Sequence, residues 1–143
     1  MNTNSKATEM KDRKIVLSTL WIFAMLNYLY NDVFGLFFNP MAQKTTLAMP
    51  QAGALVFAIL METAMAMVLL SRFLKYGPNR WASIIAGIFH TALVAWSLTG
   101  ETPLPFSIFF SSIEIVCNLF ITWYAWKWRN PEGQSVYQSV RAN

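Results

Sequence analysis

The segment from Gln51 to Arg72 constrains the fold more than any other part of the chain. Its sequence, QAGALVFAILMETAMAMVLLSR, is apolar almost throughout and carries a glutamate, Glu62, at its centre. A helix rises about 1.5 Å per residue, so a run of this length crosses a hydrocarbon core about 30 Å thick. A carboxylate at that depth is costly unless it is protonated, paired or used. The segment therefore predicts a membrane span, and Glu62 must have a reason to lie within it.

The composition indicates that the rest of the chain shares this environment. Of its 143 residues, 55% are hydrophobic and 13% are charged, whereas soluble domains carry about 25% charged residues. The apolar runs predict an all-α polytopic membrane protein, a four-transmembrane-helix bundle over residues 15–127. An N-terminal tail and a C-terminal tail flank this domain. The tails and the four spans are expected at residues 1–14 and 128–143, and at about 15–38, 51–73, 81–99 and 106–127.

Turn signals and positive charges predict how the chain crosses the membrane. Residues 39–50 form the longest expected loop, Gly77 and Pro78 mark a turn before the third span, and residues 100–105 form a short turn before the fourth. The tails and the middle loop hold ten of the eleven Lys and Arg residues, whereas the other two loops hold only Lys44. Because positively charged loops stay in the cytoplasm, both termini are expected on the cytoplasmic side.

Each predicted span carries a strong hydrogen-bonding group near the middle of the membrane. Counting along the helices places Glu62 and His90 near the midplane, with Glu114 slightly outward of it. Asn118 lies one helical turn from Glu114 on the same face, and Asn27 lies in the outer half of the first span. Such groups are expected to face the bundle interior. They are our candidates for a ligand-binding site or a proton relay.

A second group of polar residues lies near the outer end of the first span. Tyr28, Asn31 and Asp32 are expected to form the mouth of a polar pathway that leads inward through Asn27. The alternative is that Asp32 simply marks a solvated helix end. In the third span, small and polar residues fall on one stripe at helical spacing, which allows close helix packing: Ser83, Gly87, His90, Thr91, Val94 and Ser97.

Two interpretations of symmetry also follow from the sequence. The residues around Glu62 align with those around Glu114, which suggests a 2+2 internal repeat of parallel topology. The small residues of the third span, alternatively, suit a homodimer interface.

Several functions are disfavoured. The net charge of +4 comes from short basic clusters beside apolar runs, which is typical of membrane topology and not of a nucleic-acid surface. Cys117 is the sole cysteine, so no intrachain disulfide is expected, and with His90 as the sole histidine we expect no metal site. No glycine-rich phosphate loop or nucleophile elbow is present, and no cofactor is predicted.

Three segments resemble a known group of proteins. They are LWIFAMLNYLYNDV, ILMETAMAMVLLSRFLKYGPNRWASIIAGI and IEIVCNLFITWYAWKW. They resemble an uncharacterised family of small bacterial four-helix membrane proteins, over roughly residues 15–128, and more distantly the DoxX-like proteins. This resemblance implies a bundle in the cytoplasmic (inner) membrane of a bacterium, and the DoxX-like group adds a link to quinone redox chemistry. The architecture is also similar to that of emopamil-binding proteins. No catalytic motif is carried over.

Three hypotheses of function remain. We favour a module that binds or transports a small or lipophilic molecule, held by the midplane Glu, His and Asn groups. The second is a membrane enzyme or quinone-linked redox subunit in which Glu62, Glu114 and His90 act as acid–base groups. The third is a structural or accessory subunit in which the polar groups only fix the packing of the helices. A cavity that reaches the glutamates separates the first two hypotheses from the third.

Overall fold

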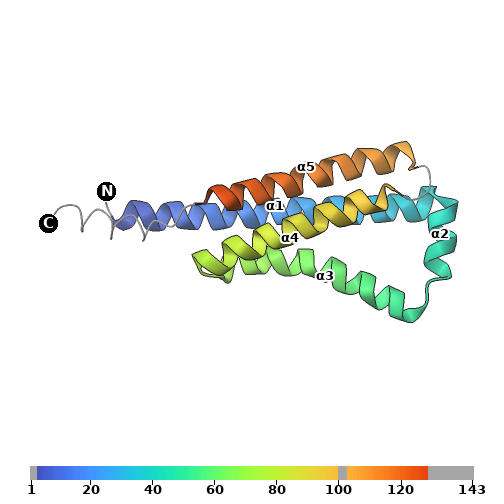
Figure 1. The fold of residues 1–143 in the computed structure, drawn as a ribbon, viewed down its shortest axis with the longest axis horizontal. Coiled ribbons are helices and arrows are strands. Elements are labelled where there is room, and N and C mark those ends of the chain that lie inside the picture. The colour runs from blue at the N-terminus through green and yellow to red at the C-terminus, as the bar shows by residue number, and fades with distance from the viewer. Residues whose placement is uncertain (1–2, 100–102, 129–143) are drawn as a thin grey trace.

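The computed structural model describes residues 3–99 and 103–128, and its described part is entirely helical apart from short connections. Five helices follow one another: α1 (Thr3–Phe38), α2 (Pro40–Leu47), α3 (Gln51–Phe73), α4 (Tyr76–Ser97) and α5 (Pro105–Lys127). The four long helices run side by side, and the short α2 lies across one end of the bundle (Figure 1). We call this the α2 end and the opposite one the terminus end. The turn at 100–102, with Glu101, and the tail from residue 129 onward lie outside the described residues.

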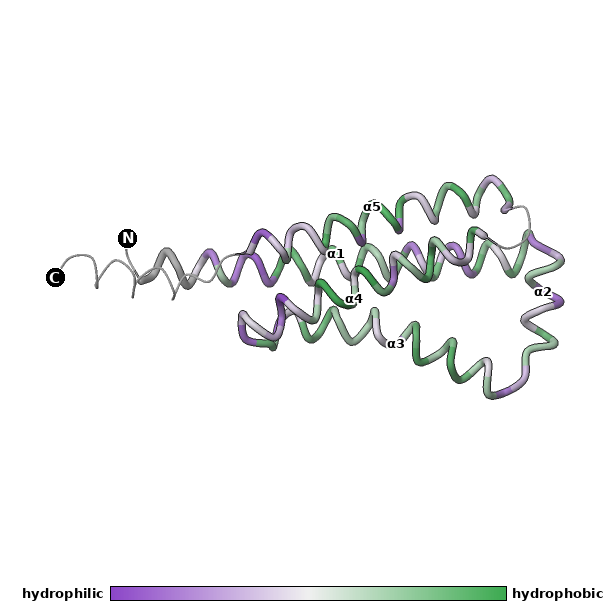
Figure 2. Tube along the Cα trace, viewed as in Figure 1, coloured by the Kyte–Doolittle hydropathy of each residue, from purple (hydrophilic) through white to green (hydrophobic). Residues whose placement is uncertain are grey.

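Three of the helices are long and apolar enough to cross a membrane: Thr8–Phe38 of α1, together with α3 and α5. Apolar residues cover most of their length (Figure 2). The chain is therefore a multi-pass membrane protein. Helix α4 has a comparable length of 22 residues but opens with the polar sequence YGPNR, which lowers its mean hydropathy.

The observed helix bounds differ from the expected ones in three places. Helix α1 begins at Thr3, so the residues before Ile15 extend the first helix. Helix α4 begins at Tyr76, because Pro78 occupies the first turn of the helix, where its missing N–H costs no hydrogen bond. The expected loop at 39–50 contains α2. Asn39 caps that helix by accepting hydrogen bonds from the backbone N–H groups of Met41 (3.1 Å) and Ala42 (3.2 Å).

The core of the bundle follows one face of each long helix. On α1 the buried side chains recur at helical spacing: Leu17, Trp21, Ala24 and Tyr28. The predicted stripe on α4 is confirmed in large part, since Ser83, Gly87, His90 and Val94 are buried. At Gly87, helix α4 packs closely against α5. A Cβ atom at this position would collide with the Thr122 hydroxyl and lie 3.2 Å from the carbonyl oxygen of Asn118.

Polar contacts join the helices at the terminus end. The Ser18 hydroxyl on α1 donates to the carbonyl of Val68 on α3 (3.0 Å) and accepts from Nε of Arg72 (3.0 Å). The amide of Asn79 on α4 donates to the carbonyl of Ser71 on α3 (2.7 Å). These bonds satisfy buried polar groups that would otherwise face hydrocarbon. Helix α3 is therefore held to both α1 and α4 in this half of the molecule.

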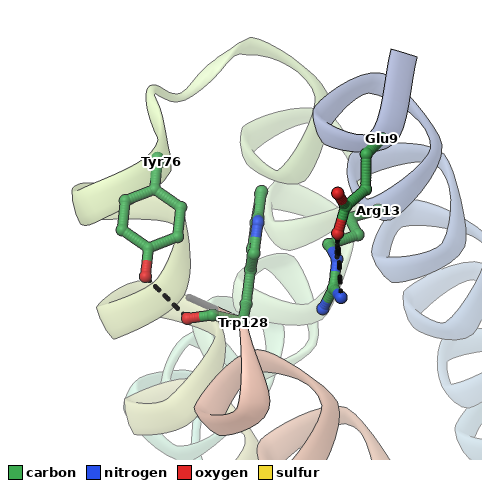
Figure 3. A network of polar contacts seen from close by, with 4 residues as sticks. All are labelled: Glu9, Arg13, Tyr76 and Trp128. Atoms are coloured by element: carbon green, nitrogen blue, oxygen red, sulfur yellow. Dashed lines mark hydrogen bonds and ion pairs between the residues drawn. The ribbon is translucent and has the colours of Figure 1, made fainter. Parts of the chain in front are cut away.

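Aromatic residues close the same end (Figure 3). The Tyr76 hydroxyl donates to the carbonyl of Trp128 (2.6 Å), and their rings meet edge to face with centroids 5.1 Å apart. On α1, Arg13 pairs with Glu9 at 3.2 Å, and its guanidinium lies 5.6 Å from the ring centroid of Tyr124 on α5. Trp128, which directly follows α5, is consequently buried and tied to the start of α4.

Helix α3 leaves the bundle toward the α2 end. Its first buried residue is Ala64, and from Gln51 to Ile59 every side chain is exposed, with the glycine Gly53 only partly covered. In Figure 1 this half of α3 diverges from the other long helices and is connected back to α1 through α2. The terminus half of the molecule is therefore closely packed, whereas the α2 half is open between α3 and the other helices.

Candidate functional site

A cavity of about 230 Å³ lies where α3 begins to diverge. Helix α3 contributes apolar residues to its lining, α1 and α5 contribute polar residues, and α4 contributes both kinds. The side chains that line it are Tyr28, Asn31, Asp32, Phe57, Leu60, Met61, His90, Leu93, Val94, Ser97 and Glu114. The cavity therefore draws on all four long helices.

Four side chains, one from each long helix, form direct contacts that we call the clasp: Tyr28, Thr63, His90 and Asn118. The Tyr28 hydroxyl donates to Oδ1 of Asn118 (2.8 Å), which joins α1 to α5. Nε2 of His90 lies 2.9 Å from the Thr63 hydroxyl, which joins α4 to α3. The rings of Tyr28 and His90 stack with centroids 5.3 Å apart and planes inclined by 13°. Tyr28 and His90 also line the cavity, so the clasp closes it on the side of the terminus end.

The hydrogen bonds of Thr63 determine where the His90 proton lies. The Thr63 hydroxyl has one proton, which it donates to the carbonyl of Leu60 at 2.6 Å. When the Thr63 hydroxyl donates to the Leu60 carbonyl, Nε2 of His90 is the donor in its contact with Thr63. A neutral His90 ring consequently carries its proton on Nε2 and leaves Nδ1 as an acceptor.

Two buried donors beside the clasp have no acceptor among the described residues. They are the indole Nε1 of Trp21, whose ring meets His90 edge-on at 5.9 Å, and Nδ2 of Asn118. A buried donor without a partner costs about 1–3 kcal/mol. Both groups are therefore spare donors next to the residues that line the cavity, although neither lines it.

The acidic part of the cavity lies one helical turn beyond the clasp, toward the α2 end. Glu114 is 3% exposed, and its Oε1 accepts a hydrogen bond from Nδ2 of Asn31 at 3.3 Å. The same Asn31 amide lies 3.4 Å from the Ser111 hydroxyl. Asp32, the residue that follows Asn31 in α1, is more exposed than Glu114 and lines the same cavity. We call Glu114 and Asp32 the acid pair.

The structure does not bring all of the sequence-predicted residues together. His90 and Glu114 line one cavity together with Tyr28, Asn31 and Asp32, and Asn118 lies beside it through its hydrogen bond with Tyr28. Asn27 is buried but turns away, since its amide donates to the carbonyl of Phe23 in its own helix (2.9 Å).

The expectation that Glu62 faces the bundle interior is wrong. Its side chain is exposed on α3 and does not line the cavity, whereas the next residue, Thr63, reaches His90. Successive helical residues are rotated by about 100°, so a position next to an inward-facing one can point outward. The pairing of Glu62 with Glu114 across an internal repeat also gains no support, because one is exposed and the other buried.

Sequence reasoning missed Thr63 and Ser111. Ser111 had a signal, because Ser111, Glu114 and Asn118 recur at spacings of three and four along one helix face. Thr63 was not considered because the glutamate beside it, Glu62, was taken as the polar group of this span. The apolar residues from α3 could not be assigned to a cavity without knowing where that helix diverges.

A second groove lies on the outer surface of α1 and α5 and has a different character. It measures about 360 Å³, and its one polar lining residue, Ser112, bonds to the carbonyl of Ile108 in its own helix. Such a groove suits lipid chains and offers no polar group to orient a ligand. Within residues 3–99 and 103–128, no cluster of three or more His, Cys, Asp or Glu side chains suited to a metal ion occurs.

The fold and this site define a small helical multi-pass membrane protein with a polar clasp and an acidic cavity between its long helices. The chain belongs to DUF6326, a family of unknown function, which it matches over residues 6–135. No curated protein and no solved structure matches it.

Proposed function

We propose that this protein binds a small lipophilic molecule in the cavity between its four long helices. The observation that carries the proposal is the mixed lining, which combines the apolar Phe57, Leu60 and Met61 of α3 with the polar Asn31 and Glu114 of α1 and α5. Binding sites for small molecules combine largely apolar walls with a few polar groups that fix orientation. An arrangement built only for packing would fill this space with side chains.

The size of the cavity limits what it holds. Pockets for drug-sized molecules enclose about 300–1,000 Å³, and this one measures about 230 Å³. It suits a small molecule, or the head group and first carbons of a longer one. The hydrocarbon chain of such an amphiphile would leave the cavity between α3 and the rest of the bundle, where the first half of α3 is exposed.

The proposal includes a membrane topology. All four long helices would span a bacterial cytoplasmic membrane, with both termini inside. Helix α4 supports this, since 22 residues rise about 33 Å and pack between spans. The uneven distribution of Lys and Arg supports the orientation. The cavity would then lie in the outer half of the membrane.

A quinone is a second candidate ligand, which the resemblance to DoxX-like proteins implies. The two spare donors at Trp21 and Asn118 favour it, because an oxidised quinone head accepts hydrogen bonds and donates none. The acid pair disfavours it, because carboxylates also accept. An acid–base role for Glu114 and His90 would apply only if such a ligand reacts in the cavity.

Photolabelling tests the proposed binding. The purified protein in phosphatidylcholine nanodiscs is irradiated with a diazirine derivative of decanol, and the labelled peptides are identified by mass spectrometry. Labelling is expected on the segments that hold Phe57–Met61 and Leu93–Ser97. The variant Ser97→Phe narrows the cavity and should lower this labelling about tenfold, which corresponds to about 1.4 kcal/mol.

The matched control is Ala95→Phe, which adds the same ring to an exposed position of α4 outside the cavity lining. The Ala95→Phe variant should be labelled to the same extent as the wild type. Equal labelling of wild type and Ser97→Phe would overturn the proposal, because the probe would then be reporting only general contact with lipid-facing surfaces.

A further inference from the structure

We infer that the head group of the bound molecule is positively charged, as in a lipophilic amine or quaternary ammonium compound. This inference rests on the proposed function, and it concerns the charge balance of the cavity. The acid pair supplies the only ionisable side chains with negative charge in the lining, and the lining contains no Lys or Arg. A lipophilic anion would therefore meet two carboxyl groups and no counter-charge.

Glu114 is the residue that most requires a partner. It is 3% exposed, yet its hydrogen bond from Asn31 is long, at 3.3 Å, and comes from a neutral amide. Among the described residues, the one ion pair joins Arg13 to Glu9 at the terminus end. A buried carboxylate is stabilised when a positive charge lies close to it. A cation in the cavity would supply this charge within reach of both Glu114 and Asp32.

None of the described Lys and Arg side chains lines the cavity. Arg72 and Arg80 bond to Ser18 and to the carbonyl of Trp126, both at the terminus end. Lys44 belongs to α2, which has no buried residue. A bound cation would supply the positive charge that no Lys or Arg side chain brings to the cavity.

The remaining lining suits a cation that carries an apolar chain. Tyr28 and Phe57 bring aromatic rings to the cavity, and aromatic faces attract ammonium groups. Leu60 and Met61 continue the apolar wall along α3 toward the open half of the bundle. The head group would lie against the acid pair while its chain follows α3.

Three decyl diazirine probes that differ only in the head group test this inference. They carry trimethylammonium, hydroxyl or sulfonate groups and are compared in nanodiscs of phosphatidylcholine, whose surface has no net charge. Labelling of the Phe57–Met61 segment should be about tenfold stronger with the trimethylammonium probe than with the alcohol, and weakest with the sulfonate. In the double variant Glu114→Gln, Asp32→Asn, the cationic preference should disappear, so that the trimethylammonium and alcohol probes label the segment equally.

The control is Glu62→Gln, which removes a carboxyl group from the exposed face of α3 and should leave the preference intact. If Glu114→Gln prevents folding, Asp32→Asn alone should still reduce the preference, because this side chain is more exposed. Equal labelling by the cation and the alcohol, or a preference that survives both substitutions, would overturn the inference. Failure of all three probes to label the cavity would instead refute the proposed function.

Discussion

The phenol ring of Tyr28 stacks on the imidazole of His90, with centroids 5.3 Å apart, and its hydroxyl bonds to Asn118 at 2.8 Å. One side chain of α1 therefore contacts both α4 and α5 at the same level of the bundle. Thr63 adds α3 through its contact with His90. The four long helices thus meet through side chains at one level, and the cavity begins directly beyond it.

Tyr28→Phe tests the contribution of the clasp to stability. The substitution keeps the ring against His90 but removes the hydroxyl, so Asn118 loses the one hydrogen bond its side chain makes among the described residues. We expect the free energy of unfolding to fall by about 1–2 kcal/mol, as for interhelical hydrogen bonds in other membrane proteins. Steric-trap unfolding in bicelles measures it. The control Tyr30→Phe, at an exposed position two residues away, should have no effect, and an equal loss in both variants would contradict the assigned role.

Gly87→Ala tests the close approach of α4 and α5. The added methyl group would collide with the Thr122 hydroxyl, so we expect a loss of about 1–3 kcal/mol of stability. Combining it with Thr122→Ala should restore part of this loss, as thermal unfolding in detergent would show. Gly35→Ala is the matched control, because no atom lies within 4 Å of a Cβ at that position. That variant should be neutral or slightly stabilising. Destabilisation equal to that of Gly87→Ala would argue against the close approach of α4 and α5 at Gly87.

Tyr76→Phe tests how the terminus end is closed. The variant loses the hydrogen bond to the Trp128 carbonyl but keeps the edge-to-face ring contact. A cost of about 0.5–1.5 kcal/mol is expected, confined to the junction of α4 and α5. Hydrogen exchange should accelerate at the end of α5 and remain unchanged near the clasp. Uniform acceleration along α5 would show that the contact supports the whole helix.

Glu62→Leu tests the exposed carboxyl group of α3. Glu62 has eleven residues of the helix on either side, or about 16 Å, so its side chain is too short to reach either membrane surface. On insertion scales, Asp and Leu at a helix centre differ by about 3 kcal/mol, and a comparable gain in apparent insertion free energy is expected for this segment. Glycosylation mapping of translocon insertion measures it. The folded protein should be at least as stable as wild type. Loss of folding or of self-association would show instead that Glu62 has a partner in the membrane.

The sequence was a good guide to the helices, because their length and apolarity are local properties. The bounds of α3 agree with the expected span at 51–73, since Pro50 ends the preceding loop and the apolar run continues on both sides of Glu62. Helix α2 was missed although Asn39 and Pro40 form a standard helix start, because the prolines at both ends of the segment suggested a loop.

The sequence predicted how deep each candidate residue lies along its helix, but not which way its side chain points around the helix axis. Counting residues placed Glu62, His90 and Glu114 at similar levels, and His90 and Glu114 do line one cavity. Counting says nothing about which way a side chain points around the helix axis. The face of α3 that carries Ala64, Met67 and Ser71 packs inward, and Glu62 lies about 200° from Ala64, so it faces outward. Only the buried neighbours of a helix resolve this angle.

The divergence of α3 bears on how binding to this protein should be quantified. The open half of that helix exposes Leu55, Val56 and Ile59, so under the proposed function and topology a molecule that passes it would move through acyl chains before it meets Asp32 or Glu114. Its relevant concentration is then its mole fraction in the surrounding leaflet, not its concentration in buffer. Two amphiphiles with identical contacts would show different apparent affinities whenever they partition differently into the bilayer, and titrations should therefore vary the amount of lipid as well as the amount of probe.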